Sequence, residues 1–187
     1  MADEQTFLVL NAVYLKKLAT AADVSNITGI PLDTVERVLS DAVERTWSLG
    51  MGGQYLLAPG GTQAVLEHYQ EAYGALRANP DLNAWYDRFE AINAQFIKHV
   101  SEWQASGDER AQSRLMRTVE RLIKSLGEIT PVLPRYEGYV RRLEQGLALV
   151  DQGQIDYVAK PTIDSIHNIW FEFHEDILSV LGRPRDT

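Results

Sequence analysis

A series of local signals near the N-terminus constrains the fold of this chain more than any other feature. Apolar residues recur at helical spacing over 7–18, which predicts a first helix. Thr20 and Asp23 have the spacing of a capping box, and Gly29 stands where a left-handed helix cap is needed, so a short second helix is expected between them. Pro31 then opens a third helix, at a position where its missing N–H costs nothing.

A hairpin signal follows these helices. The segments 46–49 and 54–57 are β-prone, and the residues between them, 50–53, include three glycines. The turn at 59–61 then leads into further helical periodicity from Thr62 onward. The order helix, helix, helix, hairpin, helix is that of a winged helix-turn-helix domain, which we expect over residues 1–78.

The remainder, 79–187, carries only helical signals. Asn79-Pro80-Asp81 interrupts the chain, and four amphipathic helices are expected after it, over about 82–104, 109–126, 136–150 and 161–181. Each has one apolar stripe, which favours an antiparallel bundle. The sequence therefore predicts a mostly α protein, in which a winged helix with a small β-hairpin wing precedes a bundle for effector binding, dimerisation or both.

Several functional classes lack their sequence signals. Without cysteine the chain forms no disulfide, thiolate or cysteine-ligated zinc site. No apolar run approaches the roughly 20 residues that span a bilayer, and the 7–14 stretch is typical of a helix rather than of a signal peptide, so a cytoplasmic protein is expected. No phosphate-binding glycine loop, nucleophile elbow or His-Glu-x-x-His motif occurs. We therefore expect no enzyme and no cofactor.

The segment 22–39 resembles the helix-turn-helix of MarR-like winged-helix regulators. Gly29, the Ile30-Pro31 pair and the Thr34-Val35 step are the usual marks of that group, and 57–61 is similar to the Leu-Thr-Pro-x-Gly turn after its wing. The C-terminal helix is also similar to the tails of small actinobacterial proteins of this type. The resemblance implies a DNA-binding transcription regulator whose helical domain senses a small molecule and which forms a homodimer.

Carried onto this chain, the resemblance places the third helix in the major groove and the wing on phosphate or in the minor groove. It assigns DNA contacts to five polar residues: Thr34, Arg37, Ser40, Arg45 and Gln54.

The charge opposes this assignment. Only Arg37 is a strong reader of bases or phosphates, the wing tip has no cation, and residues 1–75 carry four cations against nine acids in a chain of net charge -8. The alternative is a winged helix that docks a protein, in an interaction or regulatory subunit, for instance of a metabolic enzyme.

A cationic stripe stands out in the second predicted helix of the bundle. Its five members follow the spacing 4, 3, 4, 3 opposite the apolar stripe: Arg110, Arg114, Arg117, Arg121 and Lys124. Such a stripe is either a solvated face paired with neighbouring acids or a contact for DNA phosphate, an acidic partner or a phosphorylated ligand.

Six aromatic and imidazole residues of the bundle are candidates for a ligand pocket: His99, Trp103, Tyr136, His167, Trp170 and His174. All three histidines are predicted to face inward. Asp164, one turn before His167, is similar in placement to the acid of the metal sites in GntR-type effector domains, although the spacing does not match that group and no metal is assigned. A metal-free pocket and an ordinary core both fit the pattern.

Overall fold

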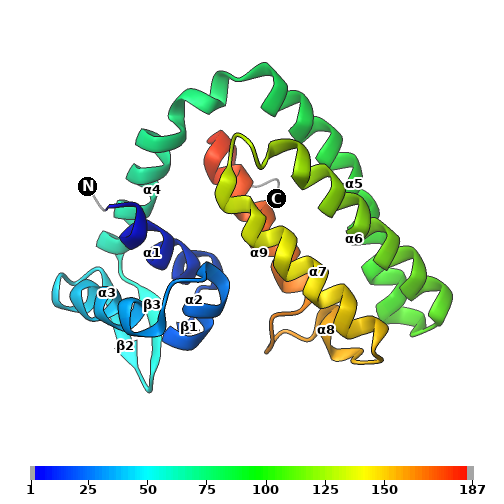
Figure 1. Ribbon diagram of the computed structural model, residues 1–187, viewed down its shortest axis with the longest axis horizontal. Coiled ribbons are helices and arrows are strands. Elements are labelled where there is room, and N and C mark those ends of the chain that lie inside the picture. The colour runs from blue at the N-terminus through cyan, green and yellow to red at the C-terminus, as the bar shows by residue number, and fades with distance from the viewer. Residues whose placement is uncertain (1–2, 185–187) are drawn as a thin grey trace. The chain divides into compact units, whose positions relative to one another are not determined.

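The computed structural model describes residues 3–184, which are mostly helical with one small antiparallel sheet near the N-terminus (Figure 1). They form two compact units. Unit 1 runs to Arg77 and includes the chain from His174 onward, and unit 2 comprises Ala78–Phe173. Among the described helices, none is long and apolar enough to cross a membrane. The predicted fold class is confirmed.

The N-terminal part of the chain has the expected three helices, hairpin and further helix, with a short strand β1 and a 3-10 helix η1 added. Its elements are α1 Glu4–Lys16, β1 Ala19–Thr20, α2 Ala21–Thr28, α3 Leu32–Glu44, β2 Ser48–Met51, β3 Gln54–Leu57, α4 Pro59–Tyr73 and η1 Gly74–Ala78. The capping box of α2 is present, because the Thr20 hydroxyl accepts from the Asp23 N–H at 3.1 Å and the Asp23 carboxylate from the Thr20 N–H at 2.9 Å. Gly29 ends α2 with φ 72°, as predicted.

The sheet differs from the prediction in two respects. Its order is β1-β3-β2, and β1, a two-residue strand, was not expected. The first hairpin strand is Ser48–Met51 rather than 46–49, because Thr46 has φ 57°, outside the extended region. Gly52 and Gly53, at φ 59° and 80°, make the two-residue turn that matches strand twist. Helix α4 begins at Pro59 rather than at Thr62.

Polar groups in the core of unit 1 attach the end of the last helix. The Tyr69 hydroxyl donates to Asn11 Oδ1 at 2.9 Å, and the Asn11 amide donates to Asp176 Oδ2 at 3.4 Å. All three residues are buried. The apolar core of this unit includes Val9, Val13, Val24, Val35 and Leu39 from the N-terminal helices.

Unit 2 contains α5 Pro80–Ser106, α6 Glu109–Ile129, the 3-10 helix η2 Pro134–Tyr136, α7 Glu137–Asp151, α8 Asp156–Ala159 and the first half of α9 Ile166–Leu181. Helix α8 was not predicted. Gly127 does not end α6, which continues to Ile129, and α9 begins five residues after Pro161. The Asn168 side chain donates to the carbonyls of Pro161 and Ile163 at 3.0 and 2.7 Å, and so holds these residues in turns.

The helices of unit 2 alternate in direction. Trp85 of α5 contacts Ser125 of α6, and the later His99 contacts the earlier Thr118, so α5 and α6 are antiparallel. Helix α9 is antiparallel to α5, because Trp85 meets Phe173 whereas Phe96 meets Trp170. The predicted antiparallel bundle is therefore the architecture of this unit, with stacked aromatic rings in its interior.

Candidate functional site

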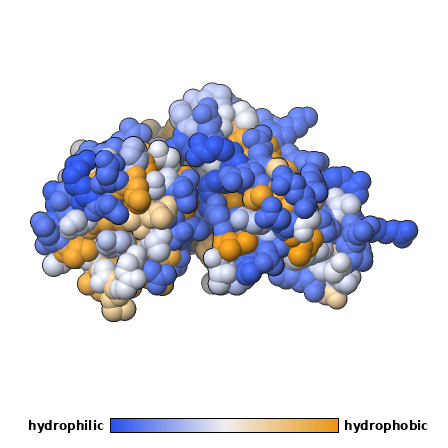
Figure 2. All heavy atoms as spheres, turned by 60° about the horizontal axis from the view of Figure 1, so that its bottom comes forward, coloured by the Kyte–Doolittle hydropathy of each residue, from blue (hydrophilic) through white to orange (hydrophobic). Residues whose placement is uncertain are grey.

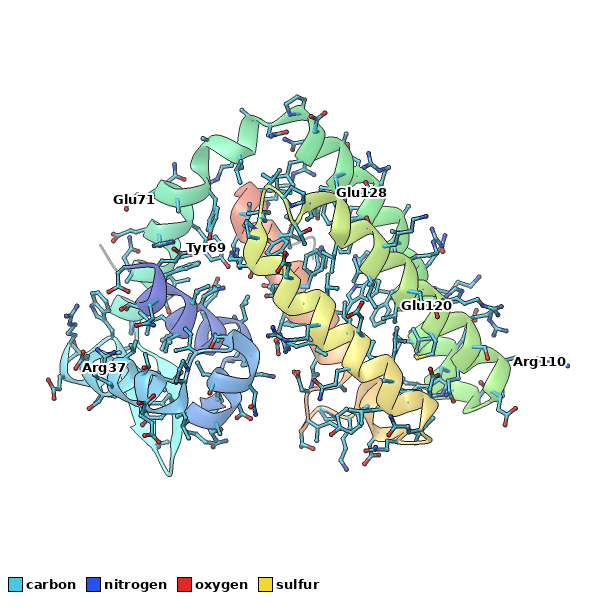
Figure 3. The ribbon with its side chains drawn as sticks, in the orientation of Figure 1. Arg37, Tyr69, Glu71, Arg110, Glu120 and Glu128 are labelled. Carbon is cyan, nitrogen blue, oxygen red and sulfur yellow. The ribbon has the colours of Figure 1, made fainter. Side chains whose placement is uncertain are left out.

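The outer face of α3 is the surface that a winged helix-turn-helix offers to a partner. Helix α3 buries Val35, Val38, Leu39 and Ala42 against unit 1. The opposite side exposes six polar residues, four of them acids: Asp33, Glu36, Arg37, Ser40, Asp41 and Glu44. The exposed face of α3 is therefore predominantly acidic (Figure 3 labels Arg37 on it).

The two arginines predicted to contact DNA line one depression of about 250 Å³, together with Asp3, Asp41 and Trp47. The Arg45 guanidinium lies 5.3 Å from the centre of the Trp47 ring. The Asp3 carboxylate accepts from the Thr6 N–H at 2.8 Å, and this hydrogen bond lowers the pKa of Asp3, which therefore stays charged. Two carboxylates thus share the depression with the two guanidinium groups.

The other three predicted DNA contacts lie elsewhere on unit 1. Ser40 and Gln54 are exposed, and Thr34 is half-buried. Gln54 is at the tip of the hairpin, opposite Met51. The two residues of the turn between these strands, Gly52 and Gly53, carry no charge.

The hairpin presents apolar side chains instead. Leu49 and Met51 are 54% and 73% exposed, and they share one face because alternate residues of a strand point the same way. Leu56 lies opposite Leu49 on β3 and extends this face. Leu32 and Val43 on α3 are exposed as well. Figure 2 shows hydrophobic atoms reaching the surface of the part of the chain that holds α3 and the hairpin. Sequence reasoning treated these residues only as strand and helix formers.

The six candidate pocket residues are not brought together as one set. Trp170 stacks on Phe96 at 3.8 Å and donates to Asn93 Oδ1 at 3.0 Å, and the His167 ring lies 6.2 Å from Phe96. Tyr136 is fully buried with Phe173 at 5.5 Å. These contacts are those of a packed interior.

His167 and the remaining three candidates are half-buried rather than buried. His99 Nδ1 lies 2.9 Å from the Thr118 hydroxyl, and Trp103 is near the end of the same helix. His174 belongs to unit 1. The most buried histidine, His68, was not among the candidates; it stacks on Phe7 at 3.9 Å.

Asp164 is a partner of an arginine. Arg142, only 5% exposed, donates to Asp164 at 2.9 and 2.5 Å and to Glu172 at 2.6 Å. Burial alone lowers the pKa of Arg142, but the hydrogen bonds to Asp164 and the charge of Glu172 raise it by more, so the guanidinium stays charged. In residues 3–184 no three histidine or acidic side chains are grouped closely enough to hold a metal ion. An arginine on the apolar stripe of α7 was the available signal for this cluster.

The five residues of the cationic stripe fall into two groups, according to whether they contact α5. Arg114 pairs with Glu102 of α5 at 3.3 Å, and Arg121 donates to Gln95 of the same helix. Arg110, Arg117 and Lys124 are exposed and form no ion pair with any residue that the structure describes. Figure 3 shows Arg110 extending away from the start of α6.

His167 gives a testable pH dependence. Burial lowers its pKa below the ordinary value of about 6.5, so the unfolded chain binds a proton more readily than the folded chain. We expect the unfolding free energy to fall as the pH drops below about 6.5. Urea unfolding at pH 8 and pH 5.5 measures this change, and His167→Gln should reduce it. An equal change in the variant would contradict the prediction.

Comparison with known proteins gives no match: no family model, curated protein or solved structure is significantly similar to this chain. The likeness to winged-helix proteins therefore depends on the order of elements in unit 1. Three helices precede a small antiparallel sheet that contains a hairpin, and a further helix follows it.

Proposed function

We propose that the chain is an interaction or regulatory subunit whose winged helix docks a protein partner. The observation that carries this proposal is the composition of the exposed surface of α3 and the hairpin. Four acids and the apolar side chains of Leu32, Val43, Leu49 and Met51 outnumber Arg37 and Arg45. A partner that fits this surface has an apolar centre and a basic rim.

The apolar contribution supports a protein rather than a nucleic acid as the partner. Fully burying a leucine or methionine side chain contributes about 1.5–3 kcal/mol, so Leu49 and Met51 can act as anchors. On DNA, the acids of α3 would instead lie in the field of the phosphates, where each unpaired carboxylate weakens binding. The glycine turn of the hairpin supplies no cation to offset them.

DNA binding by a MarR-like transcription regulator is the second candidate. Two observations favour it: the order of elements in unit 1, and the exposure of Arg37 and Ser40 on the helix that would enter the major groove. Arg37 lies close enough to Arg45 to line the same depression. A ligand-sensing role of unit 2 belongs to this candidate.

The two candidates differ in which variants abolish binding. Tagged protein is used to capture partners from the native cell extract, in parallel with Leu49→Glu/Met51→Glu. The control is Ile97→Glu/Ile155→Glu, which changes two similarly exposed apolar residues, 56% and 43%, in unit 2. A stoichiometric partner that the control retains, and that the hairpin variant binds about a hundredfold more weakly after purification, supports the proposal.

The same protein is incubated with random duplex DNA at about 50 mM salt, conditions that favour phosphate contacts. Retention that falls with salt and is abolished by Arg37→Ala would favour the transcription regulator. If that occurs and the hairpin variant captures the same proteins as the wild type, protein docking by the winged helix is wrong.

A further inference from the structure

The outer side of α6 carries a row of three cations. Arg110, Arg117 and Lys124 are seven residues apart, which corresponds to about 10.5 Å along a helix, and they lie opposite the buried Leu115 and Leu122. A seven-residue repeat keeps side chains on one seam when two helices wrap around each other. We refer to these three residues as the cationic row.

The outer side of α7 carries a row of acids with the same spacing. Glu137, Glu144 and Asp151 are also seven residues apart, exposed, and opposite the buried Arg142 and Gly146. We refer to them as the acidic row. In residues 3–184 none of the six side chains forms an ion pair or a side-chain hydrogen bond. Both rows therefore face solvent with their charges uncompensated.

The two rows are complementary in antiparallel order. Aligning Arg117 with Glu144 places Arg110 opposite Asp151 and Lys124 opposite Glu137. Each row is also interrupted once by the opposite sign, by the exposed Glu120 on α6 and the exposed Arg141 on α7. These two residues fall opposite each other in the same alignment. Four facing pairs thus have opposite charges: the three pairs between the rows, and the pair of Glu120 and Arg141, in which the signs are reversed.

The packing of unit 2 keeps the aligned residues at the same height. Trp85 contacts Ser125 of α6 and Phe173 of α9, and Phe173 contacts Tyr136 and Tyr139 at the start of α7. The end of α6 is therefore level with the start of α7. A two-fold rotation about an axis parallel to these helices leaves the position of each residue along that axis unchanged. It would therefore place Arg117 of one copy opposite Glu144 of the other.

We propose that α6 and α7 form a self-complementary dimer interface, in which the cationic row of each copy meets the acidic row of the other. A second copy fits better than a nucleic acid, because the 10.5 Å repeat and the single reversed position are matched by α7 of the same chain. Such ion pairs are exposed and individually weak, so the dimer is sensitive to salt. Both rows lie in unit 2, so this association does not depend on what the winged helix binds.

Charge reversal tests the pairing. The acidic variant is Arg110→Glu/Arg117→Glu/Lys124→Glu, and the basic variant is Glu137→Lys/Glu144→Lys/Asp151→Lys. Sedimentation at 50 mM NaCl should show a dimer for the wild type, weakened at least tenfold at 500 mM, and monomers for each variant alone. An equimolar mixture of the variants should form a heterodimer, because each then presents two rows of one sign.

A third variant separates the rows from net charge. Lys17→Glu/Lys98→Glu/Lys160→Glu changes the charge as much as the acidic variant but lies outside the rows, and it should dimerise like the wild type. A monomeric wild type at low salt, or folded variants that fail to associate when mixed, would overturn the proposal. An acidic variant that is less stable but sediments with the same assembly mass as the wild type would also overturn the proposal, because the rows would then interact within one chain.

Discussion

Replacing Arg142 with Met is expected to lower the unfolding free energy of unit 2 by about 3–5 kcal/mol, the usual cost of removing one partner from a buried ion pair. The reason is Glu172, whose side chain is only 6% exposed and accepts from Arg142 at 2.6 Å. Without the guanidinium this buried side chain loses its charged hydrogen-bond donor. Asp164, at 40% exposed, can be hydrated.

Two further variants locate the source of this loss. Arg142→Met/Glu172→Gln removes both members of the ion pair and should recover part of the lost stability, since it no longer buries a carboxylate without Arg142. Arg141→Met, at the neighbouring exposed position, should change the unfolding free energy by less than about 0.5 kcal/mol. Urea unfolding followed by hydrogen exchange in unit 2 measures all three. A double variant as unstable as Arg142→Met would show that the cost is not electrostatic.

Gly61→Ala is expected to destabilise unit 1 by about 3 kcal/mol, at the upper end of the usual cost of overpacking. A Cβ at Gly61 would lie 2.1 Å from the Trp47 carbonyl oxygen. This oxygen belongs to the backbone and also accepts from the Ala58 N–H at 2.9 Å, so it cannot move without disturbing the junction between the hairpin and α4. Only a glycine fits at this approach.

Gly127→Ala is the matched control, because a Cβ there meets nothing within 4 Å and the residue is helical. This change should raise the unfolding free energy by up to about 1 kcal/mol, through the higher helix propensity of alanine. Fluorescence of Trp47 and hydrogen exchange in unit 1 report the loss in Gly61→Ala. Similar stability of the two variants would contradict the close approach.

The local signals of unit 1 gave the most accurate predictions of secondary structure. The capping box at Thr20 and the glycine at position 29 predicted both ends of α2 correctly, because both act through hydrogen bonds and φ values of residues close in sequence. Where tertiary packing opposed a local preference, the prediction was less accurate. Gly127 was expected to end α6, but packing of the buried Ile129 carries the helix one turn further.

The candidate sites depend much more on tertiary structure. Asp164 was considered beside histidines, but its partner is Arg142, 22 residues away, and periodicity alone cannot identify such a pairing. The cationic stripe was visible in the sequence as five residues. Only the position of α5 shows that Arg114 and Arg121 contact that helix and that the other three cations form no ion pair within residues 3–184.

The sequence by itself determined the order of the main helices and the hairpin, the helical bundle and the acidic character of α3, since these follow from spacing and composition. The tertiary structure alone showed that Asp176, at the far end of the chain, is buried with Asn11 and Tyr69 in the core of unit 1. It also showed which charged side chains form no ion pair within residues 3–184. Burial and pairing depend on residues that are distant in sequence, and a pattern along one helix carries no information about them.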